Sequence, residues 1–254
     1  MRKRAFFMHN ISTRIPWLNP GDTFPSPDRA WGRLDPAPGL LAAGGDLSRQ
    51  TLEQAYRQGI FPWFSLGQPI LWWSPDPRMV LQTAQFKVHP SLHKTIRRFK
   101  NTTGCEIRID RGFGRVIRNC ASTPRQGQQG TWIVPEMIDA YENLHSQGLA
   151  HSVETWIDGE LAGGLYCVNL GSMVFGESMF AHRRDASKIA LAALVALCRH
   201  NQIDLIDCQQ NTAHLASLGA REMPRLQFQK QVSERVDRPT PPWTFEPLYW
   251  AEIV

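Results

Sequence analysis

The stretch HSVETWIDGELAGGLYCVNLGSMVFGESMF, residues 151–180, decides the fold. Asp158-Gly159 is a strong signal for a two-residue hairpin turn, and NLGS at 169–172 marks a second turn. The segments between and beside these turns are rich in apolar and aromatic residues, as strands are. The stretch therefore predicts a meander of three antiparallel strands.

Helices are predicted on both sides of this meander. Before it, Pro135 opens a helix over 135–147, with an apolar stripe that includes Tyr141. After it, a helix over 185–199 is rich in Ala and Leu, with Asp185 as its N-cap. A strand over 203–208 and a short helix follow. The order predicts an α+β fold that resembles the core of GNAT-type acyltransferases.

Residues 15–78 differ from the rest because they are rich in Pro, Gly and Trp. This composition predicts turns and short strands around one helix, which Ser48 can cap. Leu52, Ala55 and Tyr56 lie on one face of that helix. We expect a small N-terminal domain over 1–78, with an N-terminal extension, and a GNAT-like catalytic domain over 79–254.

Charge and cysteine content limit the classes of function. The 254 residues carry a formal net charge of +5 with a pI of about 9.1, which suits an anionic partner such as nucleic acid but also an ordinary basic protein. Five scattered cysteines predict neither a disulfide framework nor a zinc site, so no metal is expected. No apolar run is long enough to span a membrane. We expect a soluble, cytoplasmic protein.

A basic stripe marks the predicted helix over 90–100. Lys94, Arg97 and Arg98 share one face at i, i+3 and i+4. Their mutual repulsion is relieved by a bound polyanion such as tRNA, although an ordinary solvated face has the same pattern.

Three polar residues interrupt apolar strands. Glu177 either faces solvent or meets a hydrogen-bonding ligand inside the sheet. Asp207 and Gln209, two apart on a strand, share a face and either act on one ligand or cap the next helix. Cys208 between them is expected to point the other way, as a buried core residue and not a nucleophile.

Trp63 and Trp132 lie in loop contexts where a ring can stack on a nucleobase, although most tryptophans are core residues. No phosphate-binding GxxxxGK[ST] loop, GxGxxG, HExxH or GxSxG motif is present.

Ten sequence blocks carry a resemblance to a known family. They are GLLAAGGDLS, GIFPWF, PILWWSPDPR, GTWI, HSVETW, GGLY, FGESMF, DASK, LIDCQ and HLASLGA, in this order. Together, over residues 24–228, they are similar to the bacterial leucyl/phenylalanyl-tRNA–protein transferases. That resemblance implies transfer of leucine from Leu-tRNA or phenylalanine from Phe-tRNA, with methionine as a further substrate, to proteins that begin with Lys or Arg. The product is an N-terminal signal for protein degradation.

The resemblance also implies a role for each matching residue. Asp207 and Gln209 match the pair beside the reacting amine, and Glu177 matches the acid that contacts the aminoacyl α-amino group. Trp63 and Trp132 match the aromatics that hold the terminal adenosine. The apolar pocket for the aminoacyl side chain corresponds to Leu165, Met179 and Ile206. The tRNA-binding helix corresponds to Lys94, Arg97 and Arg98.

No cofactor is expected, because an aminoacyl ester is already activated and needs no ATP. We expect Gln209 to hold the incoming amine while Asp207 orients Gln209 and favours loss of the amine proton, in a monomer. The alternatives are an acyl-CoA-dependent GNAT enzyme, another aminoacyl-tRNA-dependent transferase of similar fold, and a non-catalytic tRNA-binding protein.

Overall fold

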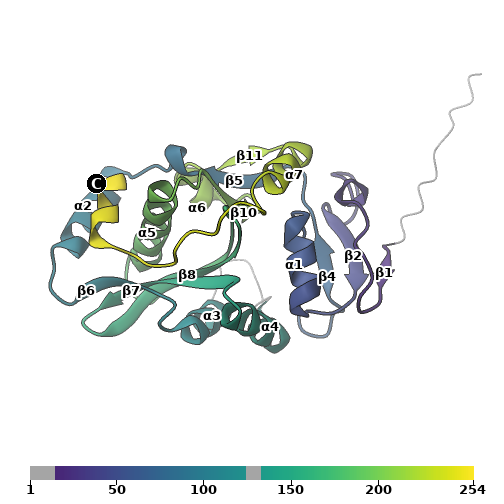
Figure 1. Cartoon of the computed structure of the whole chain (residues 1–254), viewed down its shortest axis with the longest axis horizontal. Helices are drawn as coiled ribbons and strands as arrows, with labels where there is room; N and C mark the ends of the chain where they lie inside the picture. The colour runs from purple at the N-terminus through teal and green to yellow at the C-terminus, as the bar shows by residue number, and fades with distance from the viewer. Residues whose placement is uncertain (1–14, 124–132) are drawn as a thin grey trace, which may run out of the picture.

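The computed structural model describes residues 15–123 and 133–254. Figure 1 shows a smaller part formed by the first residues of the chain beside a larger part formed by the rest. The smaller part holds a four-stranded sheet in the order β1-β2-β4-β3, and the larger part holds a seven-stranded sheet in the order β11-β5-β10-β9-β8-β7-β6. Among the residues described, no helix is both long and apolar enough to cross a membrane.

Short elements make up the smaller part, as its composition predicts. They are β1 (Trp17–Leu18), the 3-10 helix η1 (Pro27–Arg29), β2 (Leu40–Gly44), α1 (Arg49–Arg57), β3 (Phe61–Pro62) and β4 (Leu71–Trp73). The predicted cap of α1 is confirmed, because the Ser48 hydroxyl accepts a hydrogen bond from the Thr51 amide. Figure 1 shows that α1 lies on the side of its sheet that faces the larger part. The buried face of α1, which includes Tyr56, therefore packs between the two parts.

The larger part begins at β5 and contains the remaining elements. They are β5 (Arg78–Gln82), η2 (Thr83–Gln85), α2 (Pro90–Lys100), β6 (Cys105–Ile109), α3 (Phe113–Ser122), α4 (Pro135–Ser146), β7 (Ala150–Ile157), β8 (Glu160–Leu170), β9 (Met173–Ala181), α5 (Ala186–His200), β10 (Leu205–Gln209), α6 (Ala213–Ser217), β11 (Arg221–Met223), α7 (Arg225–Ser233) and η3 (Pro247–Glu252). The predicted order of helix, three antiparallel strands, helix, strand and short helix is present from α4 to α6. The α+β class is confirmed.

The turns of the meander follow their predicted chemistry. Asp158 and Gly159 both have positive φ, at 54° and 79°, as a type I′ hairpin turn requires. Asp185 holds the predicted N-cap position of α5, but its side chain makes no capping bond. It lies in the left-handed region with φ 62°, and its carboxylate accepts a hydrogen bond from Lys188 instead.

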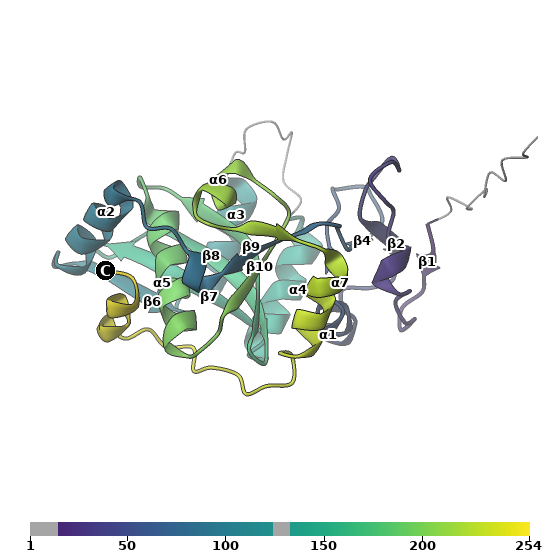
Figure 2. The same cartoon turned by 90° about the horizontal axis from the view of Figure 1, so that it is seen from above.

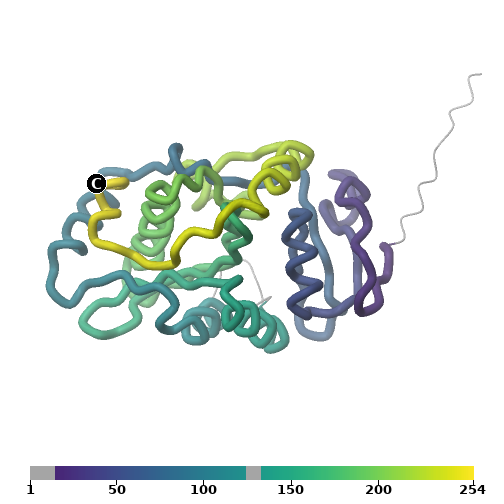
Figure 3. The backbone as a smooth tube through the Cα atoms, in the orientation of Figure 1, coloured from purple at the N-terminus to yellow at the C-terminus, as the bar shows by residue number. Residues whose placement is uncertain are grey.

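Helices cover both faces of the larger sheet. Helix α5 packs on β7 and β8 from one face, and α3 and α4 pack on the other (Figures 1 and 2). After α7, residues 234–254 run along the side of the sheet that carries α5 and end in η3, which packs on α5 (Figure 3). The centre of the sheet is therefore enclosed, and α5 is almost wholly buried.

The β9–β10 junction differs from the other ladders of this sheet. These two strands are parallel and are joined through α5, whereas the other strand pairs are antiparallel. Their pairing is limited to Ile206 with Val174 and Asp207 with Phe175. Beyond these residues the two strands part, and the gap between them positions the site described next.

Candidate active site

A pocket of about 300 Å³ opens where β9 and β10 part. Its wall on β9 includes Gly176, Glu177, Ser178 and Met179, and its wall on β10 runs from Ile206 to Gln209. Further residues come from β3, β8, α5 and α6, and they include Phe61, Trp63, Leu165, Leu191, Leu194 and Leu215. Most of the lining is apolar, and the polar groups gather at the split.

Two β-bulges place the polar groups. In the β8–β9 ladder, Tyr166 pairs with Ser178 and Cys167 pairs with Gly176, so Glu177 is an extra residue. In the β10–β5 ladder, Asp207 pairs with Val80 and Gln209 pairs with Met79, so Cys208 is an extra residue. Bulges redirect side chains and often lie next to active sites. The regular alternation that predicted a shared face for Asp207 and Gln209 therefore ends at Asp207.

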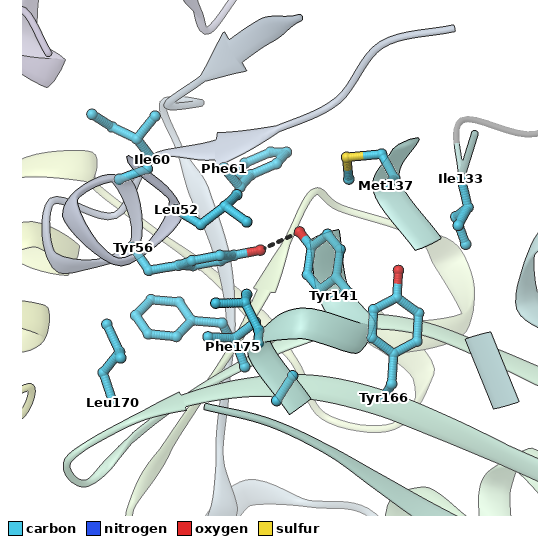
Figure 4. Close-up of a cluster of buried hydrophobic side chains, with 14 of the residues drawn as sticks. Leu52, Tyr56, Ile60, Phe61, Ile133, Met137, Tyr141, Tyr166, Leu170 and Phe175 are labelled. Atoms are coloured by element: carbon cyan, nitrogen blue, oxygen red, sulfur yellow. Dashed lines mark hydrogen bonds between the residues drawn. The ribbon is translucent and has the colours of Figure 1, made fainter. Parts of the chain in front are cut away.

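Glu177 is the centre of a hydrogen-bond network that joins the two parts of the molecule. Its carboxylate accepts hydrogen bonds from the hydroxyl of Tyr56 on α1 at 2.7 Å and of Tyr141 on α4 at 3.3 Å. Gln209 Nε2 on β10 donates to the same carboxylate at 3.0 Å. The two tyrosine hydroxyls lie 2.5 Å apart (Figure 4). Glu177 is therefore neither a solvent-facing residue nor a residue without partners.

Burial sets the protonation of this network. Desolvation raises the pKa of Glu177 to about 7, the negative charge of Asp207 adds to the rise, and the hydrogen bonds from Tyr56, Gln209 and Tyr141 oppose it. Burial and the charge of Glu177 raise the pKa of both tyrosine hydroxyls well above their usual value, so both remain donors. A cation that enters the pocket favours the ionised form of Glu177.

Asp207 is fully buried in an ion pair with Arg78 at the start of β5. Arg78 Nε donates to Asp207 Oδ1 at 2.8 Å and Nη2 donates to Oδ2 at 2.6 Å. Asp207 Oδ1 also accepts a hydrogen bond from the main-chain amide of Gln209 at 2.9 Å. Asp207 thus touches Gln209 through the backbone.

The alternative role of Asp207 and Gln209 as caps of α6 is wrong. Thr212 is the N-cap of that helix, and its hydroxyl accepts a hydrogen bond from the amide of Leu215. Cys208 does not point away from the site, because it lines the same pocket and packs with the apolar cluster there. Burial raises the pKa of its thiol, which disfavours the thiolate that a nucleophile needs.

The pocket brings together most of the residues that the sequence singled out. Glu177, Asp207 and Gln209 meet at the split, and the apolar residues Leu165, Met179 and Ile206 line the interior with Trp63 at the edge. The indole of Trp63 lies 5.4 Å from that of Trp73, centre to centre. Trp132 lies outside the described residues.

The basic stripe lies elsewhere. Lys94, Arg97 and Arg98 are exposed on α2, while Leu92, Ile96 and Phe99 bury the opposite face. Figures 1 and 2 both place α2 at the end of the larger part that is farthest from the smaller part. Only a large ligand can reach both this stripe and the pocket.

Sequence reasoning missed Tyr56, Tyr141 and Arg78. Both tyrosines were assigned to apolar helix stripes, although a buried tyrosine hydroxyl needs a hydrogen-bond partner and so signals a polar neighbour. Arg78 stands at the end of the PILWWSPDPR block and carries no local signal, because its partner is 129 residues away.

The chemistry of this site suits the transfer of an aminoacyl group. A narrow apolar pocket can hold a side chain, a carboxylate at its wall can accept an ammonium group, and the amide of Gln209 lies beside that carboxylate. These features fit the class of aminoacyltransferases. Among the described residues, no group of three or more His, Cys, Asp and Glu side chains is placed to hold a metal ion.

Comparison with known proteins gives the family. The model of the leucyl/phenylalanyl-tRNA protein transferases matches residues 80–233, and that of their N-terminal domain matches residues 45–76. The chain belongs to the leucyl/phenylalanyl-tRNA–protein transferase family. It is 62% identical to the leucyl/phenylalanyl-tRNA–protein transferase of Polaromonas sp. (strain JS666 / ATCC BAA-500), covering 97% of each chain. It is 60% identical to that of Albidiferax ferrireducens, covering 94% of each chain.

Likeness to solved structures is weaker. L-PGS from Bacillus licheniformis has a TM-score of 0.39 and 12% identity, covering 78% of this chain and 65% of that one. A GCN5-related N-acetyltransferase from Kribbella flavida has a TM-score of 0.29 and 10% identity, covering 65% and 57%. At these TM-scores the likeness is too weak to assign a substrate.

Proposed function

We propose that this chain moves leucine or phenylalanine, and also methionine, from aminoacyl-tRNA to the α-amino group of proteins that begin with Lys or Arg. The new N-terminal residue then marks the acceptor protein for degradation. The single observation that carries the proposal is the apolar pocket with Glu177 at its wall, in a chain of this family.

The pocket accounts for the donor. A volume of about 300 Å³ is at the small end of ligand pockets and suits one amino-acid residue. Leu165, Met179 and Ile206 surround the side chain, while the Glu177 carboxylate accepts hydrogen bonds from the α-ammonium group. An apolar pocket separates substrates that differ by one methylene by only about 1–3 kcal/mol, which agrees with the acceptance of several unbranched-Cβ side chains.

The reaction needs little beyond positioning. The neutral amine of the acceptor attacks the ester carbonyl, the carbon–oxygen bond to the terminal ribose breaks, and the amine proton finally resides on the ribose oxygen. The amine has a pKa near 8, so a usable fraction is neutral at pH 7. The Gln209 amide donates to Glu177, and its oxygen is the acceptor for an N–H of the incoming amine.

The RNA is held at two places. Trp63, which lines the pocket, stacks on the terminal adenosine, and we propose the same role for Trp132. Lys94, Arg97 and Arg98 contact phosphates of the tRNA body. We propose that the enzyme acts as a monomer. The reaction takes place in the cytoplasm, where aminoacyl-tRNA is made.

An acyl-CoA donor fits less well. Such a donor needs backbone amides at the start of α5 for its pyrophosphate. In this chain the segment 181–188, AHRRDASK, has no glycine, and Asp185 holds the N-cap position. The segment therefore lacks the glycine-rich backbone that such a loop uses to approach a pyrophosphate.

Incubation with labelled Leu-tRNA or Phe-tRNA and peptides that begin with Arg, Lys or Ala tests the proposal. Label is expected on the Arg and Lys peptides and not on the Ala peptide. Binding of uncharged tRNA is measured beside it over a salt series, and replacement of Lys94, Arg97 and Arg98 by Ala should flatten the salt dependence. Intact tRNA binding without transfer to the Arg peptide would refute the enzymatic role.

A further inference from the structure

Arg78 is a buried cation that the proposed reaction does not use directly. Only 1% of Arg78 is exposed, and its guanidinium lies between the rings of Phe61 and Phe228, 4.7 and 4.6 Å from their centroids. Phe61 belongs to β3 of the smaller part and Phe228 to α7 of the larger part. Arg78 is therefore held from both parts of the molecule.

Stability alone does not explain the ion pair between Arg78 and Asp207. Burying two charges costs much of what their attraction returns, and apolar replacements of such pairs are often neutral or stabilising. In addition, Arg78 Nη1 has no hydrogen-bond partner among the described residues. A buried donor without a partner is a cost. The arrangement calls for a role beyond holding the fold together.

The partner of Arg78 controls the backbone at Gln209. Gln209 has φ 60°, in the left-handed region that is unfavourable for a residue with a side chain. Asp207 Oδ1 accepts the main-chain N–H of Gln209 and so stabilises this conformation, which directs Gln209 Nε2 to Glu177. Arg78 in turn fixes both oxygens of Asp207.

A second arginine–aspartate pair, next to the start of β10, provides a natural control. Arg235 Nε and Nη2 donate to the two oxygens of Asp204 at 3.0 and 2.8 Å, and Arg235 is also buried. Asp204 precedes β10, whereas Asp207 lies near its end, and neither Arg235 nor Asp204 lines the pocket. The two pairs share a two-point arginine–aspartate contact. They differ in their distance from Gln209 and in burial, because 67% of the Asp204 side chain is exposed and Asp207 is fully buried.

We propose that Arg78 is a positioning residue for the transfer reaction, which acts through Asp207 on the main chain of Gln209. The inference rests on the proposed function. It assigns Asp207 to holding Gln209 and not to removing a proton, since both of its oxygens are engaged by Arg78. The rings of Phe61 and Phe228 hold the guanidinium between them, in the orientation in which it meets both oxygens of Asp207.

The test is a double-mutant cycle with Gln209. Arg78→Lys keeps the charge but loses the two-point contact, and a small misplacement at a reacting centre can cost about 100-fold. We expect Arg78→Lys to lower kcat about 100-fold with tRNA affinity unchanged. In a Gln209→Ala background the same substitution should change kcat by less than about 2-fold, because Arg78 then has nothing left to position.

Arg235→Lys is the matched control and should leave kcat unchanged in both backgrounds. If Arg78→Lys does not fold, Phe228→Leu loosens the guanidinium instead and should show the same dependence on Gln209. If Arg78→Lys lowers kcat by the same factor in the wild-type and Gln209→Ala backgrounds, Arg78 does not act through Gln209. If Arg235→Lys lowers kcat as much as Arg78→Lys does, the role of Arg78 is likewise overturned. A wild-type enzyme that transfers nothing overturns the proposed function itself.

Discussion

Two glutamates of the same sheet, the wholly buried Glu154 on β7 and the half-buried Glu177 on β9, have different surroundings. Glu154 is wholly buried and accepts hydrogen bonds from the Gly112 amide, the Ser152 hydroxyl and the Trp156 indole, at 2.7, 2.8 and 2.8 Å. Two of these donors lie two residues away on its own strand. The third is the N-cap residue of α3.

The donors to Glu177 come from three separate elements, α1, α4 and β10. One side of Glu177 also faces the pocket. A carboxylate with nearby, permanent donors serves the fold, whereas one with distant donors and an open side can take a ligand. A buried position in the sheet therefore does not by itself mark an acid as functional.

The largest expected difference between the two glutamates is in activity. Glu177→Ala removes the proposed acceptor for the α-ammonium group, and a hydrogen bond to a charged group contributes about 1.5–3 kcal/mol. We predict a fall in kcat/KM for transfer of roughly 10- to 150-fold, measured with Leu-tRNA and an Arg peptide. Activity equal to that of the wild type would place Glu177 with Glu154 as a residue of the fold.

Glu154 should give the opposite result. Glu154→Gln turns an N–H group toward donors that need an acceptor, which costs about 1–3 kcal/mol. We predict a decrease of this size in the free energy of unfolding, measured by urea denaturation, with unchanged transfer per folded molecule. A loss of transfer at full stability would contradict the division between the two acids.

The pH dependence of stability distinguishes the two acids on a smaller scale. Burial raises the pKa of Glu177 to about 7 from an ordinary value of 4.5, so between these values the folded protein holds a proton that the unfolded chain has lost. This contribution to stability is present below pH 4.5 and is lost as the pH rises through 7, by at most about 1.4 kcal/mol per pH unit.

The measurement is urea unfolding at pH 5.5 and 6.5. In the wild type the free energy of unfolding should fall between these two pH values. Glu177→Gln should remove this fall, and the Glu154→Gln variant should keep it. Identical slopes in the wild type and in Glu177→Gln would show that Glu177 has an ordinary pKa in the folded protein.

Local signals in the sequence predicted much of the fold. Asp158-Gly159 gave the hairpin, Pro135 the start of α4, and Ser48 the cap of α1, because each of these features depends on neighbouring residues alone. The positions of Glu177 inside an apolar strand and of Asp207 and Gln209 at the end of another were also visible. Their roles in the reaction remain predictions, as does the division of the chain after residue 78.

The parts that could not be predicted depend on distant residues or on one extra residue in a ladder. A bulge at Glu177 or Cys208 leaves no trace in the alternation of a single strand. The Tyr56–Tyr141 contact joins residues 85 apart, and tertiary packing alone brings them together. For these reasons the sequence placed the polar residues near one another but could not supply their partners.

The hydrogen bond from Tyr56 to Glu177 has a consequence for the synthesis of the chain. The ribosome makes α1 first, and the carboxylate that Tyr56 meets is made 121 residues later. The amide of Gln209 comes later still. A nascent chain therefore cannot complete the hydrogen-bond network around Glu177, and with it the proposed ammonium site, until at least 209 of its 254 residues have been made.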